Sequence, residues 1–221
     1  FIIGATIAGQ LMTRTGKYKT LALISAVVMT AGLFMFNQMD LNTTAITVVI
    51  NMATFGIGVG ALMPIMNVSV QNAFPYKKMG TVNANLQFAR SMAGVIAAPV
   101  FGSLLNAGFI RKYNEVEPSG INELDGGVRE GIMAMDPQQL ITAEAQESVR
   151  QSFTQLGDGG SSLFENWLEA IKTSLASGIS TLFFVGLIFA ILTVIIVFFL
   201  PESKLQSDEY YENPDEVPEA K

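Results

Sequence analysis

The side chains best placed to do chemistry in this sequence are polar groups surrounded by apolar residues. Asn51, Asn67 and Gln71 lie in the uncharged run 41–76, and Arg90 directly precedes a second uncharged run. In apolar surroundings such groups hydrogen-bond to a neighbouring element or line a polar cavity, because an unpaired polar group is costly there. The sequence leaves both roles open for the three amides. For Arg90 we weigh a helix-packing or cavity role against an interfacial one, in which its guanidinium reaches the nearest water.

Composition excludes several other kinds of chemistry. The sequence has no Cys and no His, which removes thiol nucleophiles, Cys/His zinc sites and histidine acid–base pairs. The net charge is −6, and the acidic residues are concentrated in segments 111–176 and 201–221, so no basic surface is available for nucleic acid. We therefore expect no metal, no cofactor, no nucleic-acid partner and no enzymatic activity.

A group of small residues forms a second candidate feature. Gly94, Ala98 and Gly102 recur at every fourth position, so on a helix they share one face and allow a neighbouring backbone to approach closely. Pro99 lies in the middle of this face and removes one backbone hydrogen bond, which predicts a kink. We interpret the face as a site of helix packing.

The elements that carry these residues are predicted to be long apolar helices. Hydrophobic residues make up 50% of the chain, charged residues 14%, and the mean hydropathy is +0.40. Four runs contain no charge, and each reaches the length of about 20 residues that spans a bilayer. These runs are 20–39, 41–76, 91–110 and 173–200. A soluble protein could bury one such helix but hardly four, so the sequence predicts an all-α membrane protein.

We expect four complete transmembrane helices and one truncated helix at the start, in residues 1–12. The complete helices are predicted at 20–38, 45–74, 83–109 and 177–200. Because the sequence opens inside an apolar run and without a start Met, we interpret it as a C-terminal fragment. Its predicted parts are transmembrane helices in 1–110, an extracellular loop with two amphipathic helices in 111–176, the last transmembrane helix in 177–200, and a disordered acidic cytoplasmic tail in 201–221.

The orientation follows from the charges of the short loops, because lysine and arginine are retained on the cytoplasmic side. The loops after the first and third helices are basic, whereas the loop between them, MDLNTT, has one acid and no base. Alternation then places both basic loops and segment 201–221 in the cytoplasm and segment 111–176 outside.

The predicted extracellular segment contains two helix patterns. Asp136 followed by Pro137 is a typical helix start, and apolar residues then recur at every fourth position up to Phe153. A second apolar stripe, 163–175, includes Trp167. We expect this second helix to lie along the membrane surface with Trp167 at headgroup level. For the segment as a whole we favour a small packing cap over the helix ends against a role in substrate binding.

The loop after the first helix resembles a motif of the major facilitator superfamily. Its sequence, GQLMTRTGKYK, is similar to the superfamily's Gly-x-x-x-Asp-Arg-x-Gly-basic-basic loop. Gly9, Arg14, Gly16 and Lys17 occupy motif positions, whereas Thr13 stands where the acid is expected. The motif is degenerate in the C-terminal half of that superfamily, so this departure suits a position in the second half.

A second resemblance lies in the predicted helix that follows Arg90. Gly94-x-x-x-Ala98-Pro99-x-x-Gly102 is similar to the Gly-x-x-x-Gly-Pro-x-x-Gly-Gly motif of the superfamily's antiporters, which occurs in the fifth helix of a half. If the last predicted helix is the sixth, both motifs fall where the superfamily's internal repeat expects them. The stretch before this motif, the long outer loop and the Leu-Pro-Glu ending also resemble the fourteen-helix drug/proton antiporters.

The resemblance implies the C-terminal half of a major facilitator helix bundle, in a proton-coupled multidrug efflux antiporter that works by alternating access in the cell membrane. Its implied partners are small lipophilic solutes, cations among them, protons, the lipid bilayer and the N-terminal half of the same transporter. Two alternatives stay open. The first is an exporter of a specific lipid or metabolite on the same fold, and the second is a membrane assembly or receptor protein without transport.

Overall fold

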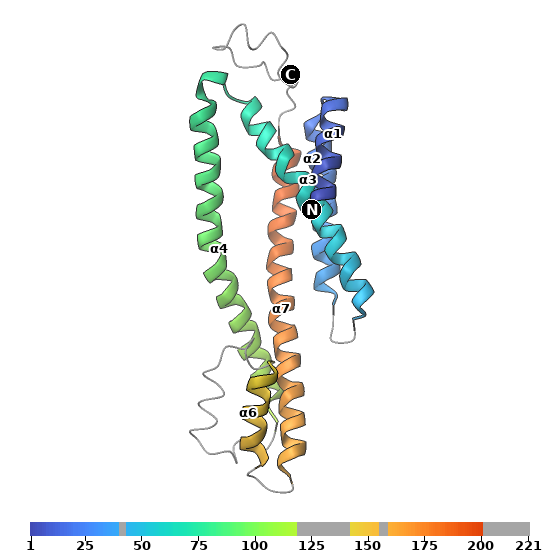
Figure 1. The fold of residues 1–221 in the computed structure, drawn as a ribbon, viewed down its shortest axis with the longest axis vertical. Coiled ribbons are helices and arrows are strands. Elements are labelled where there is room, and N and C mark those ends of the chain that lie inside the picture. Colours follow the sequence, from blue (N-terminus) through green and yellow to red (C-terminus); the bar gives the residue numbers. More distant parts are fainter. Residues whose placement is uncertain (40–42, 119–141, 155–158, 201–221) are drawn as a thin grey trace. The chain divides into compact units, whose positions relative to one another are not determined.

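The computed structural model describes residues 1–39, 43–118, 142–154 and 159–200, and most of these residues are helical (Figure 1). No β-strand occurs within these ranges. The elements in chain order are α1 (Ile2–Thr15), α2 (Tyr18–Asn37), α3 (Ala45–Asn72), the 3-10 turn η1 (Tyr76–Lys78), α4 (Met79–Val116), α6 (Ala143–Thr154) and α7 (Gly160–Phe198). The helix start predicted at Asp136 and the disorder predicted for 201–221 lie outside the described residues.

Four helices are long and apolar enough to cross a membrane. They are α2, α3, α4 together with η1, and α7. α1 has 14 residues and is therefore about 21 Å long, shorter than the apolar core of a bilayer. The prediction of an all-α membrane protein with four complete spans and one short helix is confirmed. At about 57 Å, α4 with its 38 residues is longer than a bilayer core needs, so part of it extends beyond the core.

The helix bounds agree with the hydropathy pattern where a polar loop follows directly. α2 and α3 begin and end within two residues of their predicted positions. α4 is longer at both ends than the predicted 83–109, because polar residues that favour neither lipid nor a turn continue the helix there. Pro64 and Pro99 lie inside α3 and α4, and both helices continue through their proline.

One predicted boundary is absent from the structure. We expected a surface helix ending before residue 177 and a separate span after it, but α7 is a single helix. Trp167 is not at a membrane surface in this arrangement, because its side chain is fully buried against Phe153 of α6, with ring centroids 5.8 Å apart. No residue near 177 interrupts the helix. Gly178 is the weakest helix former there, and its packing against α4 supports the helical conformation at this point. In the structure Trp167 therefore has a packing role within the protein.

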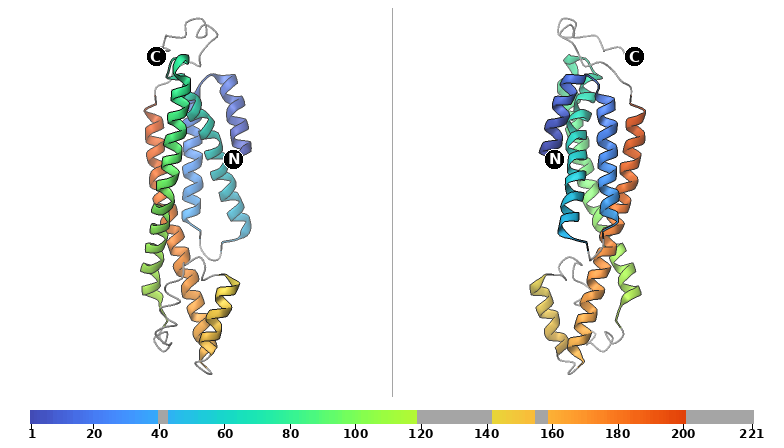
Figure 2. Two further views of the ribbon diagram at one scale, coloured as in Figure 1. Left: turned by 60° about the vertical axis from the view of Figure 1, so that its left-hand side comes forward. Right: turned by 90° about the vertical axis from the view of Figure 1, so that its right-hand side faces the viewer.

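The first of two compact units contains residues 1–39, 43–98 and 183–200 of the described chain. α1, α2 and α3 lie side by side in it (Figure 2). Its buried cluster also includes the last turns of α7 and consists of Ala8, Met12, Tyr18, Ala22, Ala26, Leu62, Ile65 and Val197. Glycines permit the close approach of α2 and α3, since a Cβ added at Gly32 would lie 2.7 Å from Phe55 Cα and one at Gly58 would lie 2.6 Å from Met29 Cα.

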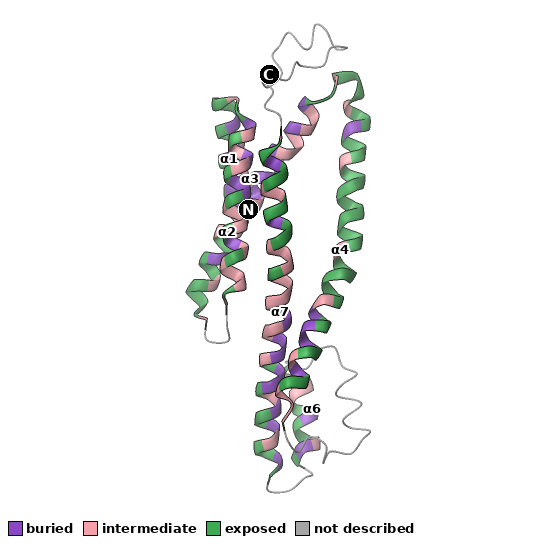
Figure 3. Ribbon diagram, turned by 180° about the vertical axis from the view of Figure 1, so that it is seen from behind, coloured by how far each residue is buried: buried purple, intermediate pink, exposed green. Residues whose placement is uncertain are grey.

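The second unit contains the described residues among 99–182. The end of α4, α6 and the start of α7 bury a common face, which appears as the purple surfaces of these segments in Figure 3. Aromatic side chains dominate the cluster, which consists of Leu105, Phe109, Tyr113, Val149, Phe153, Phe164, Trp167, Ala170, Ile171 and Leu175. α6 begins at a side-chain cap, because the Ala145 amide donates a hydrogen bond to Thr142 Oγ1 over 3.4 Å.

Candidate functional site

The predicted polar residues meet between α3 and α4 in the first unit. Arg90 of α4 donates a hydrogen bond from Nη2 to Asn67 Oδ1 of α3 over 2.9 Å. Arg90 lies about 16 Å along α4 from its first residue, Met79. Asn67 follows Pro64 by one turn, in the half of α3 that approaches the turn to α4. The sequence thus brings a cation and an amide oxygen together across two helices that are joined by the tight η1 turn.

A second amide pair extends this contact toward the turn. Gln71 Nε2 donates to Asn83 Oδ1 over 2.8 Å. Asn67 and Gln71 are one turn apart on α3, and Asn83 and Arg90 are two turns apart on α4, so each pair of residues shares one helix face. We call these four residues the polar strip. No site role was predicted for Asn83 from the sequence, because it lies among other polar residues at the start of α4.

The charge of Arg90 is only partly satisfied by this contact. A guanidinium carries five N–H donors, and Asn67 accepts from one of them. Within the described residues Arg90 forms no ion pair, and its side chain is exposed on this chain. The hydrogen bond to α3 favours a helix-packing or cavity role over a side chain that only reaches water. The remaining donors are free to bind a carboxylate, a carbonyl or a phosphate.

Asn51 is separated from the polar strip and faces α2. Its side chain is 1% exposed, and Nδ2 donates to the Met35 carbonyl over 3.3 Å. Oδ1 is buried and finds no hydrogen-bond partner among the residues that the structure describes. Asn51 therefore contributes to the contact between α2 and α3. It does not lie beside Arg90.

The small-residue face of α4 has no neighbour among the described residues. Gly94, Ala98, Pro99 and Gly102 are exposed, and no atom lies within 4 Å of a Cβ added at either glycine. The close glycine contact of α4 lies elsewhere, at Gly108, where an added Cβ would lie 2.9 Å from the Gly178 Cα of α7. Sequence reasoning missed that contact, although Ser174 and Gly178 form a small-xxx-small pair of the kind that allows helices to touch.

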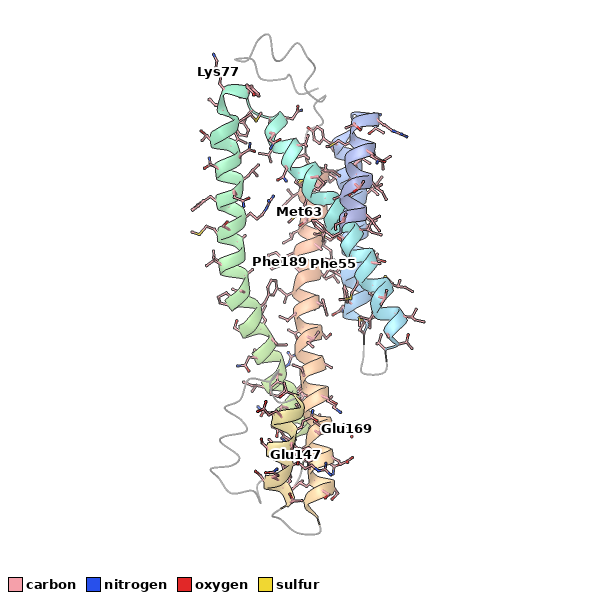
Figure 4. All side chains as sticks on the ribbon, viewed as in Figure 1. Phe55, Met63, Lys77, Glu147, Glu169 and Phe189 are labelled. Carbon is pink, nitrogen blue, oxygen red and sulfur yellow. The ribbon has the colours of Figure 1, made fainter. Side chains whose placement is uncertain are left out.

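The basic loop motif lies at the junction of α1 and α2. Gly16 ends α1 in the left-handed conformation with φ 63°, and its amide donates to the Met12 carbonyl over 3.0 Å. Arg14 and Lys17 flank this turn and are exposed, while a Cβ added at Gly9 would have open space around it. The glycine at 16 is thus explained by backbone conformation. The junction, η1 with Lys77, and the end of α7 lie at one end of the first unit (Figures 2 and 4).

The fold and this arrangement define a multi-pass helical membrane protein whose polar residues lie between helices. Within the described residues no cluster of His, Cys, Asp and Glu could hold a metal ion. No family model and no solved structure matches the chain.

Curated relatives carry the assignment further. The chain is 25% identical over 233 aligned residues to the multidrug transporter protein MdtP of Bacillus subtilis, which covers 100% of this chain and 40% of the relative. It is 21% identical over 206 residues to multidrug resistance protein 3 of the same organism, covering 93% of this chain and 37% of the relative. It is 26% identical over 123 residues to the MFS-type efflux pump MMF1 of Pseudozyma antarctica, and the alignment covers 54% of this chain and 23% of the relative. The chain therefore spans less than half the length of these relatives, and it is homologous to MFS-type multidrug and efflux transporters.

Proposed function

We propose that the chain is the C-terminal half of a proton-coupled multidrug efflux antiporter of the cell membrane. The observation that carries this proposal is the alignment with a protein named as a multidrug transporter along the whole of this chain. The loop motif around Gly16 and the antiporter-like motif from Gly94 to Gly102 support it, since both lie on the elements that the superfamily resemblance predicts.

The proposed mechanism is alternating access, in which two helix bundles rock about a central site. The open face of α4 at Gly94, Ala98 and Gly102 provides the close, sliding contact with the N-terminal half. Arg90, held by Asn67, directs its remaining donors to an acceptor in that half. The coupling acids and most of the proton chemistry then belong to the N-terminal half, and the solutes are small and lipophilic.

The test is transport by the full-length polypeptide that contains this chain. Cells that express it should extrude ethidium, and a protonophore that collapses the proton gradient should abolish this efflux. A matched control is the same polypeptide with Arg90→Ala at equal expression, which should reduce efflux without changing membrane insertion. Ethidium retention equal to that of cells without the protein would contradict the multidrug proposal.

The two alternatives give different results in the same cells. An exporter of a specific lipid or metabolite would ignore ethidium but release one endogenous solute in a protonophore-sensitive way. A non-transporting assembly or receptor protein would change no flux. The relatives are named as multidrug or efflux proteins, which supports transport over the second alternative.

A further inference from the structure

The junction of α1 and α2 presents a cluster of unpaired positive charges. Arg14, Lys17 and Lys19 lie within six positions, and none of them forms an ion pair among the described residues. Arg14 and Lys17 are exposed, and Lys19 is half-buried. We call these three residues the basic junction.

The end of α7 is held at the basic junction. Lys19 Nζ lies 6.0 Å from the centre of the Phe198 ring, within the range of a cation–π interaction. Val197 is 2% exposed and belongs to the same buried cluster as Tyr18, the residue before Lys19, and Leu200 packs against that cluster. Leu200, the last described residue, therefore lies beside the basic junction.

The segment that follows Leu200 carries the opposite charge. Residues 201–221 contain seven acids and two bases. Asp208 and Glu209 follow Leu200 by eight and nine positions, and a chain of that length can span about 27 Å, several times the distance from Phe198 to Lys19. Because the acidic segment is covalently attached to α7, its effective concentration at the basic junction is about millimolar. An anionic membrane surface repels the same segment and does not compete for it.

From this juxtaposition we propose that the acidic segment 201–221 binds the basic junction of the same chain. The contact covers Arg14 and Lys17, which are positions of the loop motif, and so ties the end of α7 to the start of α2. The inference does not depend on transport, because it rests on charge and on the anchored end of α7. The competing occupant of the basic junction is the phosphate of anionic lipids.

The experiment measures how fast two introduced cysteines form a disulfide. Thr15→Cys beside the junction and Val217→Cys in the acidic segment are combined in the complete polypeptide, which in this segment of the chain has no native cysteine. The protein is placed in phosphatidylcholine nanodiscs, and loss of free thiols after addition of copper phenanthroline is followed. Non-reducing gels exclude disulfides between molecules.

Replacement of Asp208, Glu209, Asp215 and Glu216 by their amides should slow disulfide formation about tenfold, which corresponds to about 1.4 kcal/mol. Arg14→Gln with Lys17→Gln should slow it similarly, as should 1 M salt, which screens charges beyond about 3 Å. The matched control replaces four exposed acids of the second unit, Glu144, Glu147, Glu165 and Glu169, by Gln and should leave the rate unchanged.

An unchanged rate in the Asp208, Glu209, Asp215 and Glu216 variant would overturn the proposal. If the rate instead falls when phosphatidylglycerol is added and ignores the neutralised acids, the basic junction binds lipid phosphate and the proposal is wrong. Circular dichroism of each variant shows whether the helices are retained, and the Arg14 and Lys17 variant provides a second reading if the acidic variant fails to express.

Discussion

At the scale of single residues, Arg90 is the side chain whose chemistry matters most. It donates to Asn67 across the α3–α4 pair and keeps further donors available. We predict that Arg90→Ala and Arg90→Lys both reduce ethidium efflux about tenfold in the full-length polypeptide. Hydrogen bonds to charged groups contribute about 1.5–3 kcal/mol, and about 1.4 kcal/mol corresponds to one factor of ten. Lysine keeps the charge but loses the planar fork of donors.

The control for Arg90 is Arg111→Lys in the same helix, beyond the uncharged run, which should leave efflux unchanged. Asn67→Ala should weaken efflux less than Arg90→Ala, and the double variant should resemble Arg90→Ala because the two residues share one contact. Efflux near wild type for Arg90→Lys, at matched expression, would show that the guanidinium acts only as an interfacial cation.

Trp167 allows a second prediction at this scale. Its indole is fully buried between Phe153 and Phe164, and within the described part of the chain its Nε1 has no hydrogen-bond partner. Trp167→Ala should destabilise the α4, α6 and α7 cluster by about 3–5 kcal/mol. Trp167→Phe should cost less than about 1.5 kcal/mol, because the lost packing is offset by removal of an unpaired N–H.

Melting temperatures of the purified variants measure this difference. Cleavage of α6 by a protease under native conditions gives a second readout, since α6 packs through Phe153 on Trp167. If Trp167 were a headgroup anchor, Phe and Ala would have similar small effects in detergent, and both would weaken only the association with lipid.

The candidate residues could be found from sequence to different degrees. Three polar residues could be identified because a polar group beside or within an apolar run needs a hydrogen-bond partner: Arg90, Asn67 and Gln71. In the structure each has a partner on the neighbouring helix. The partner itself could not be predicted, since Asn83 lies among other polar residues at the start of α4. The burial of Trp167 could not be predicted either, because an amphipathic stripe fits a membrane surface and a protein core equally well.

At the scale of elements, α4 has two groups of small residues with different surroundings. Gly108 has no room for a side chain because Gly178 lies against it, whereas Gly94 and Gly102 have open space. We predict that Gly108→Leu destabilises the second unit by about 1–3 kcal/mol through overpacking. Gly94→Leu and Gly102→Leu should leave the melting temperature of this chain unchanged.

The two variants of the open face separate stability from transport in the full-length polypeptide. Gly94→Leu and Gly102→Leu should insert normally but abolish efflux, because an enlarged side chain prevents close approach of the N-terminal half. The matched control is Val95→Leu, an exposed neighbour on a different face of α4. Normal efflux in both glycine variants would mean that this face meets lipid and that the antiporter-like motif is accidental.

Element positions were predictable where the hydropathy changes sharply and less so elsewhere. A span ends where charges and turn residues begin, which located α2 and α3 closely. The boundary expected inside α7 was absent because a change from amphipathic to uniformly apolar residues alters what a helix contacts without interrupting its backbone hydrogen bonds. α4 likewise continues beyond the predicted 83–109 at both ends, because the change from apolar to polar residues there does not interrupt its backbone hydrogen bonds.

At the scale of the whole molecule, the described residues form two units with different surroundings. The first unit exposes many large apolar side chains, among them Val95, Ile196 and Phe199. Lipid or other transmembrane helices can cover such surfaces, and water cannot do so favourably. The second unit buries an aromatic cluster and places charged residues such as Glu147 and Glu169 on its surface (Figure 4). The exposed apolar side chains of the first unit suit lipid or neighbouring transmembrane helices, and the charged surface of α6 and of the first turns of α7 suits water.

The charges of the two units predict how the chain lies across the membrane. Arg14, Lys17, Lys77 and Lys78 are gathered at one end of the first unit, which we expect to face the cytoplasm together with segment 201–221. Segment 111–176, in which acids outnumber bases, should face outside. Ser161 is exposed at the start of α7, and Ser207 lies in the acidic segment.

Single cysteines at these two positions test this topology in the otherwise cysteine-free segment. On intact cells an impermeant maleimide should label Ser161→Cys and leave Ser207→Cys unlabelled, whereas both should react after the membrane is permeabilised. The physical reason is that moving the lysines and arginines of short loops across the bilayer during insertion is strongly disfavoured, so these loops fix the inner side. Labelling of Ser207→Cys but not Ser161→Cys on intact cells would reverse the orientation and place the basic junction outside.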